Sequence, residues 1–122
     1  MKLSKRKFSD ICAEVSAKNV SDTIETAKRI NDENGTEFAH TRLLMDVLCM
    51  KYLVKALGFG DDNEELEITK ETFNDAQNEA IGLASDGMDD ASGKLIMTLE
   101  AIHFTELLAK RLFGEETKDE SN

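Results

Sequence analysis

Residues 36–57 read TEFAHTRLLMDVLCMKYLVKAL, a stretch of the chain without glycine or proline. This composition favours an α-helix, because glycine and proline are the residues that a helix interior tolerates least. The apolar residues cover too much of the helix circumference for a helix with one solvated face, so we expect this to be the central helix of the fold. The apolar residues are Phe38, Leu43, Leu44, Val47, Leu48, Tyr52, Leu53, Val54 and Leu57.

The flanking sequence predicts four more helices, at about residues 4–17, 22–34, 69–86 and 92–113. The first has apolar residues at the i, i+3, i+4, i+7 spacing of a helix face, beginning at Phe8. The helix at 22–34 is expected to end at Asn34-Gly35, which suits a left-handed helix end, and the helix at 69–86 is expected to end at Asp86-Gly87. The last helix is expected to bury Leu95, Ile96, Leu99, Ile102, Leu107, Leu108 and Leu112.

Length and composition predict one all-α domain. The chain has 122 residues, with seven glycines and no proline. Its net charge of −10, from 25 acidic and 15 basic residues, argues against a nucleic acid or an anionic membrane as partner. No apolar run approaches the roughly 20 residues of a membrane span. We therefore expect a cytoplasmic protein in which Cys12 and Cys49 are buried free thiols.

An ordered series of matches indicates an internal duplication. Asn34-Gly35 and Asp86-Gly87 lie 52 residues apart, and so do Arg42-Leu-Leu-Met45 and Lys94-Leu-Ile-Met97. Phe59-Gly60 and Phe113-Gly114 then follow, each succeeded by acidic residues. The series predicts a helical domain over residues 1–114 with two repeats, at about 4–60 and 69–114. Residues 115–122 are expected to form a disordered acidic tail.

This double motif resembles the N-terminal domain of the Clp unfoldases, which consists of two tandem helical repeats. The first repeat offers Arg42-Leu-Leu-Met-Asp-Val-Leu48 and Leu53-Val-Lys-Ala-Leu-Gly58, and the second offers Lys94-Leu-Ile-Met-Thr-Leu99. The family has a histidine in the positions of Arg42 and Lys94. Some members bind phosphoarginine through an acid just before that histidine; Thr41 and Gly93 stand there in this chain, so that activity is not carried over.

The resemblance implies a docking module rather than an enzyme. The family's domain binds adaptor proteins and unfolded or tagged substrates and passes them to an ATPase ring. We expect the first turns of two helices, at residues 36–41 and 91–93, to present backbone N–H groups to a partner near the junction of the repeats. The candidate partner-binding residues are Glu37, Phe38, Thr41 and Gly93, and no cofactor is expected.

Two other classes of protein stay open. Glu37 and His40, like Glu100 and His103, have the Glu-x-x-His spacing that di-iron carboxylate bundles use. Because Glu37 lies in the first turn of its helix and Glu100 lies mid-helix, the two motifs would sit at different levels. We therefore expect no metal there, and we expect His103 to pack among apolar neighbours. The second alternative is an acidic viral or mobile-element accessory protein that binds or chaperones a basic partner.

Overall fold

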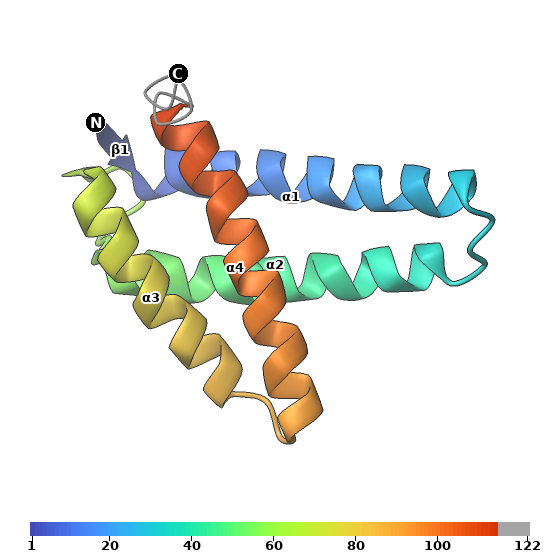
Figure 1. Ribbon diagram of the computed structural model, residues 1–122. Helices are drawn as coiled ribbons and strands as arrows, with labels where there is room; N and C mark the ends of the chain where they lie inside the picture. Colours follow the sequence, from blue (N-terminus) through green and yellow to red (C-terminus); the bar gives the residue numbers. More distant parts are fainter. Residues whose placement is uncertain (115–122) are drawn as a thin grey trace, which may run out of the picture.

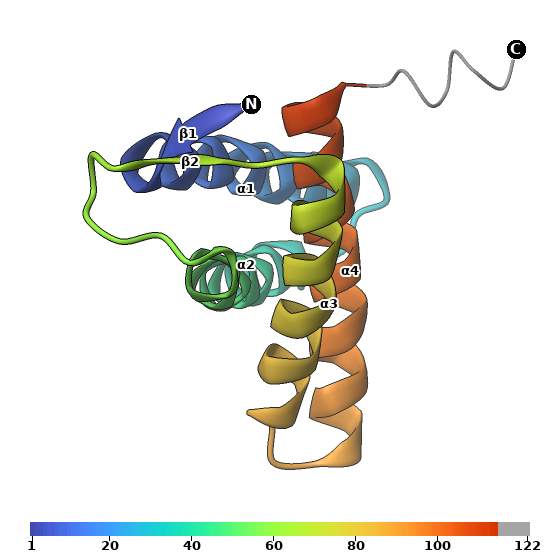
Figure 2. The same ribbon diagram turned by 90° about the vertical axis from the view of Figure 1, so that its left-hand side faces the viewer.

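Two helical hairpins cross to form the protein, and the computed structural model describes residues 1–114 (Figure 1). The first hairpin consists of α1 (Lys5–Arg29) and α2 (Gly35–Leu57). The second consists of α3 (Lys70–Asp86) and α4 (Ala91–Phe113). Figure 2 shows α3 and α4 running side by side, with α2 seen almost end-on beside them. The predicted all-α class is confirmed.

A short two-stranded sheet joins the hairpins. Strand β1 (Lys2–Ser4) pairs antiparallel with β2 (Glu65–Glu67), and Leu3 lies opposite Leu66. The sheet brings the acidic connection after α2 back to the start of α1, where the backbone N–H of Arg6 donates to the carbonyl oxygen of Asp62. Part of this acidic connection is therefore ordered against the first hairpin.

The helix ends follow from residues that satisfy free backbone groups. The Ser4 hydroxyl accepts from the N–H of Lys7 at 3.1 Å and so caps α1. Thr69 and Thr72 form a capping box at α3, and the Asp90 carboxylate accepts from the N–H of Gly93 at 2.6 Å to cap α4. These caps agree with the starts predicted for the last two helices.

The two helices predicted at residues 4–17 and 22–34 are in fact one. Helix α1 continues for 25 residues and ends at Arg29, just before Asn31, which has a positive φ of 57°. The prediction was wrong because nothing between Ala17 and Asp22 interrupts a helix. Gly35 does not end α1 but begins α2, where a Cβ atom would lie 2.0 Å from the Cβ of Ala27. Its missing side chain therefore lets the two helices approach closely.

The core forms where the hairpins cross, and the buried residues of α4 agree with the predicted set at Leu108 and Leu112 but not in the first half of the helix. Met97, Ala101, Phe104 and Leu108 are fully buried. Of the predicted set, Leu95, Ile96 and Leu99 are instead exposed, as are Phe38, Leu43, Leu44 and Val47 of α2. Helix α2 does contact all three other helices, but it buries a narrower face than its composition suggested.

The structure also bears on the remaining sequence-based expectations. Cys12 and Cys49 are buried free thiols, as predicted. No helix within residues 1–114 is long and apolar enough to cross a membrane. Each hairpin falls within one predicted repeat, but α1 has 25 residues and α3 has 17, and the duplication stays a prediction. The predicted tail at 115–122 lies outside the described residues.

Candidate functional site: a buried polar network beside an open groove

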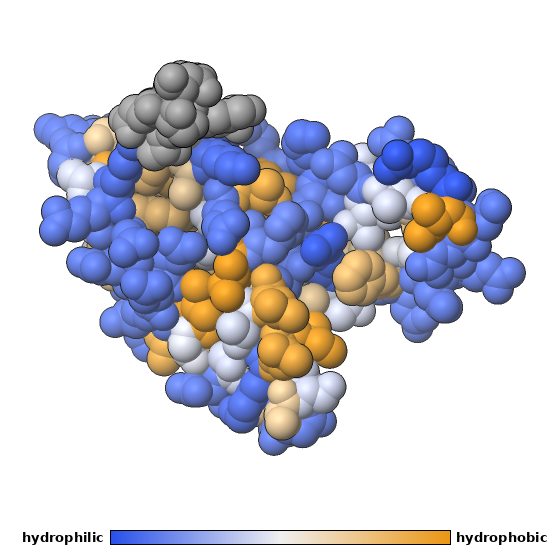
Figure 3. All heavy atoms as spheres, viewed as in Figure 1, coloured by the Kyte–Doolittle hydropathy of each residue, from blue (hydrophilic) through white to orange (hydrophobic). Residues whose placement is uncertain are grey.

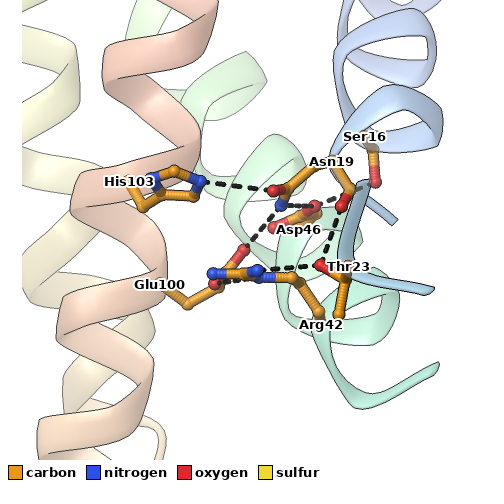
Figure 4. Close-up of polar contacts among 7 residues, drawn as sticks. All are labelled: Ser16, Asn19, Thr23, Arg42, Asp46, Glu100 and His103. Atoms are coloured by element: carbon orange, nitrogen blue, oxygen red, sulfur yellow. Dashed lines mark hydrogen bonds and ion pairs between the residues drawn. The ribbon is translucent and has the colours of Figure 1, made fainter. Parts of the chain in front are cut away.

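Asn19 of α1 connects three helices through one side chain (Figure 4). Its amide nitrogen donates to Oδ2 of Asp46 on α2, at 3.2 Å, and to Oε2 of Glu100 on α4, at 3.1 Å. With the amide in this orientation, its oxygen is left to accept from Nε2 of His103 at 3.2 Å. His103 thus donates from Nε2, instead of packing among apolar neighbours as predicted. Asn19 is only 5% exposed, and its side chain positions Asp46, Glu100 and His103.

Arg42 lies beside this amide and is held in place by three different groups. Its Nε donates to Oε1 of Glu100 at 2.8 Å, and one terminal nitrogen donates to the hydroxyl of Thr23 at 2.9 Å. The guanidinium carbon lies 5.3 Å from the centre of the Phe38 ring, within the range of a cation–π contact. The arginine therefore neutralises Glu100 and also orders Phe38.

Asp46 is the most buried acid of the network, and only 1% of the residue is exposed. Its Oδ2 accepts from Ser16 and Asn19, while its Oδ1 is buried without a hydrogen-bond partner among residues 1–114. Burial, followed by the nearby carboxylate of Glu100 and its charge, raises the pKa of Asp46 to about 8. At neutral pH the folded protein therefore keeps Asp46 mainly protonated. The carboxylate that faces the Arg42 cation is that of Glu100.

An open groove of about 430 Å³ borders the network between α1, α2 and α4. Ile30 and Phe38 at its rim are 67% and 50% exposed. Arg42 and His103 reach it from the network, so hydrogen-bond donors lie next to apolar surface. The groove is lined by Asn19, Asp22, Thr23, Thr26, Ala27, Ile30, Asp32, Gly35, Phe38, Arg42, His103 and Leu107.

The structure separates the four residues predicted to bind a partner. Phe38 lines the groove, whereas Glu37 and Thr41 are exposed on α2, and the Thr41 hydroxyl donates to the Glu37 carbonyl oxygen. Gly93 lies at the start of α4, and its N–H donates to Asp90. The first turns of α2 and α4 are at the far ends of different hairpins (Figure 1), so the expected shared site at the repeat junction does not form.

The two Glu-x-x-His motifs do not converge either. Glu37 and His40 are exposed on α2, while Glu100 is bonded to Arg42 and Asn19. Among residues 1–114, no three His, Cys, Asp or Glu side chains are grouped so that they could hold a metal ion. Within this part of the chain, the motifs therefore do not form the ligand set of a di-iron bundle.

Comparison of the chain with protein-family models, with curated proteins and with solved structures found no match. The resemblance to the Clp N-terminal domain thus rests only on the residues quoted for it, and the function has to be argued from the groove and the network.

Proposed function

We propose that the chain is a non-enzymatic docking module that holds a segment of a partner protein in the groove between α1, α2 and α4. The observation that carries this proposal is the pair of exposed apolar side chains, Ile30 and Phe38, at the rim of a hollow of about 430 Å³. Exposed apolar surface beside a few fixed polar groups is typical of binding sites. Because Arg42 orders Phe38, the rim is preorganised for a partner.

The polar groups support docking rather than chemistry. Asn19, Asp46 and Glu100 bond mainly to one another and hold three helices together. A partner's apolar side chain would pack against Phe38 and Ile30, and its backbone oxygens would meet the guanidinium of Arg42, which lines the groove. Asp22 and Asp32 at the groove, with a net charge of −10, favour a partner segment that also carries basic residues.

The resemblance to the Clp family suggests which partners to test first. They are the ATPase ring of a Clp-type chaperone or protease machine, its protease, its adaptors and its tagged substrates. On this proposal the protein works in the cytoplasm, recognises these proteins and leaves the ATP-driven step to the ring.

Affinity capture with matched baits tests the proposal. The baits are the wild type, Phe38→Asp in the groove and Leu44→Asp, which alters an exposed apolar residue of the same helix outside the groove. Proteins that the wild type and Leu44→Asp retain and Phe38→Asp loses are the expected result, with Clp components among them. Equal retention by all three baits, or stoichiometric iron or manganese in the wild-type bait, would contradict a groove-based, non-enzymatic module.

A further inference from the structure

Strand β2 keeps one of its two backbone edges free. The Met1 amine donates to the carbonyl oxygen of Ile68 at 3.1 Å, and the Ile68 N–H donates to the carbonyl oxygen of Met1 at 2.7 Å. The two residues are therefore a hydrogen-bonded pair, and such pairs alternate along an antiparallel sheet with pairs that are not hydrogen-bonded. Glu65 and Glu67 occupy the alternate positions, so their backbone N–H and C=O groups point away from β1. Among residues 1–114, these outward groups have no hydrogen-bond partner.

A hollow of about 350 Å³ follows this free edge. Leu66, Glu67 and Ile68 all line it, although neighbouring side chains of a strand point to opposite faces. The main chain of β2 therefore borders the hollow. The other walls are the end of α2 and one side of α3, with the residues Ala56, Leu57, Thr72, Asp75, Ala76 and Glu79. An extended segment that pairs with β2 would fill this hollow.

The charged side chains that line the hollow are all acidic. Glu67 is paired with the Met1 amine, which leaves Asp75 and Glu79 of α3. Both are exposed, and because they are four residues apart they lie on the same side of the helix. Within residues 1–114, neither has an ion-pair partner, and the exposed Lys55 of α2 does not line the hollow. Figure 3 shows hydrophilic side chains over the first half of α3, in contrast to the apolar side chains over the first half of α4. Charge complementarity therefore favours a basic segment.

Strand β1 shows which side-chain pattern pairs with β2 on its other edge. Lys2 lies opposite Glu67, and Leu3 lies opposite Leu66. Leu3 is buried and Leu66 packs against the core, so the lysine lies on the acidic face of β2 and the leucine on its apolar face. A strand on the free edge would meet the same two faces. The pattern that fits it is therefore an alternation of basic and apolar residues.

We propose that the free edge of β2 binds an extended segment of a partner protein in which basic and apolar residues alternate. Backbone hydrogen bonds to Glu65 and Glu67 hold the segment as a third strand, its apolar side chains enter the hollow and its basic side chains lie near the acidic ones. This site is separate from the groove between α1, α2 and α4, because the two hollows share no lining residue. The inference therefore goes beyond the docking function of the groove and can fail independently of it.

Titration of the isotope-labelled protein with short peptides, followed by NMR, tests the strand addition. The probe is a capped Lys-Leu-Lys-Leu-Lys peptide, and the controls are Glu-Leu-Glu-Leu-Glu and the basic peptide with N-methylated backbone amides. We expect saturable shifts of the Glu65 and Glu67 amide signals with the probe alone, because N-methylation removes the donors that strand pairing needs. Absence of saturable shifts, or equal binding of the N-methylated peptide, would overturn the proposal. Shifts confined to residues 30–42 would place the basic peptide in the groove and would also overturn it.

Two double variants test the role of the charges. Asp75→Asn with Glu79→Gln is expected to weaken binding of the probe about 3- to 10-fold, because it removes both acids that α3 presents to the hollow. Asp86→Asn with Asp89→Asn makes the same change of net charge at exposed positions next to the turn before α4, and we expect it to leave the affinity within about twofold. Equal weakening by both pairs of substitutions would show an effect of net charge alone and contradict the proposed site.

Discussion

Replacement of Asp46 by asparagine should change how the stability of the protein depends on pH. The pKa of Asp46 is raised to about 8 in the folded protein, from an ordinary value of 3.8. The folded state therefore binds more protons than the unfolded state between about pH 4 and pH 8, so this carboxyl makes the protein less stable as the pH rises. Within that window, each rise of one pH unit lowers the free energy of unfolding by about 1.4 kcal/mol. From pH 5 to pH 7 the free energy of unfolding therefore falls by about 3 kcal/mol.

Urea unfolding followed by circular dichroism at pH 5, 6 and 7 measures this effect. The difference in unfolding free energy, wild type minus Asp46→Asn, reports the carboxyl of Asp46 together with its interaction with Glu100. We expect this difference to fall by about 1.4 kcal/mol per pH unit, with the variant the more stable protein at pH 7. Asp75→Asn, which makes the same acid-to-amide change on the exposed surface of α3, serves as the matched control. A difference that stays flat or rises with pH for Asp46→Asn would refute the argument.

Two further predictions concern packing and burial. Gly35→Ala should destabilise the protein by about 1–3 kcal/mol, because the new Cβ would lie 2.0 Å from the Cβ of Ala27. Gly82→Ala should stabilise the protein by about 0.5–1 kcal/mol, because its new Cβ would have no atom of residues 1–114 within 4 Å and alanine favours a helix. Urea midpoints measure both, and equal shifts would contradict the close approach of α1 and α2. Burial, more than their mutual interaction or nearby charge, raises the pKa of Cys12 and Cys49 to about 12, so both thiols should resist iodoacetamide at pH 8 until the protein is unfolded. Mass spectrometry that found them alkylated in the folded protein would contradict their burial.

Helix patterns predicted most of the fold because they are local. The helices expected at residues 36–57, 69–86 and 92–113 agree with α2, α3 and α4 to within a residue or so. Local patterns failed where two alternatives had the same spacing. On α4, the stripe with Leu95 and Leu99 and the stripe with Met97 and Phe104 are both helical, and only the crossing of the hairpins decides which one is buried.

The polar network depends even more on that crossing. A signal for it is present in the sequence, since Asp46 follows Arg42 by four residues and precedes Cys49 by three, on the face that α2 buries. A polar residue at such a position predicts a buried partner, because an unpaired buried carboxylate is costly. No local pattern specifies that the partners are Asn19 on α1 and Glu100 on α4, which are 81 residues apart.

The groove is the central claim, and hydrogen exchange of the chain with and without its purified, captured partner tests it most directly. We expect slower exchange in the partner complex at residues 30–42, the turn and first part of α2 that carry Ile30 and Phe38, with α3 unchanged. Protection confined to α3, or no protection between residues 30 and 42, would contradict a docking site in this groove.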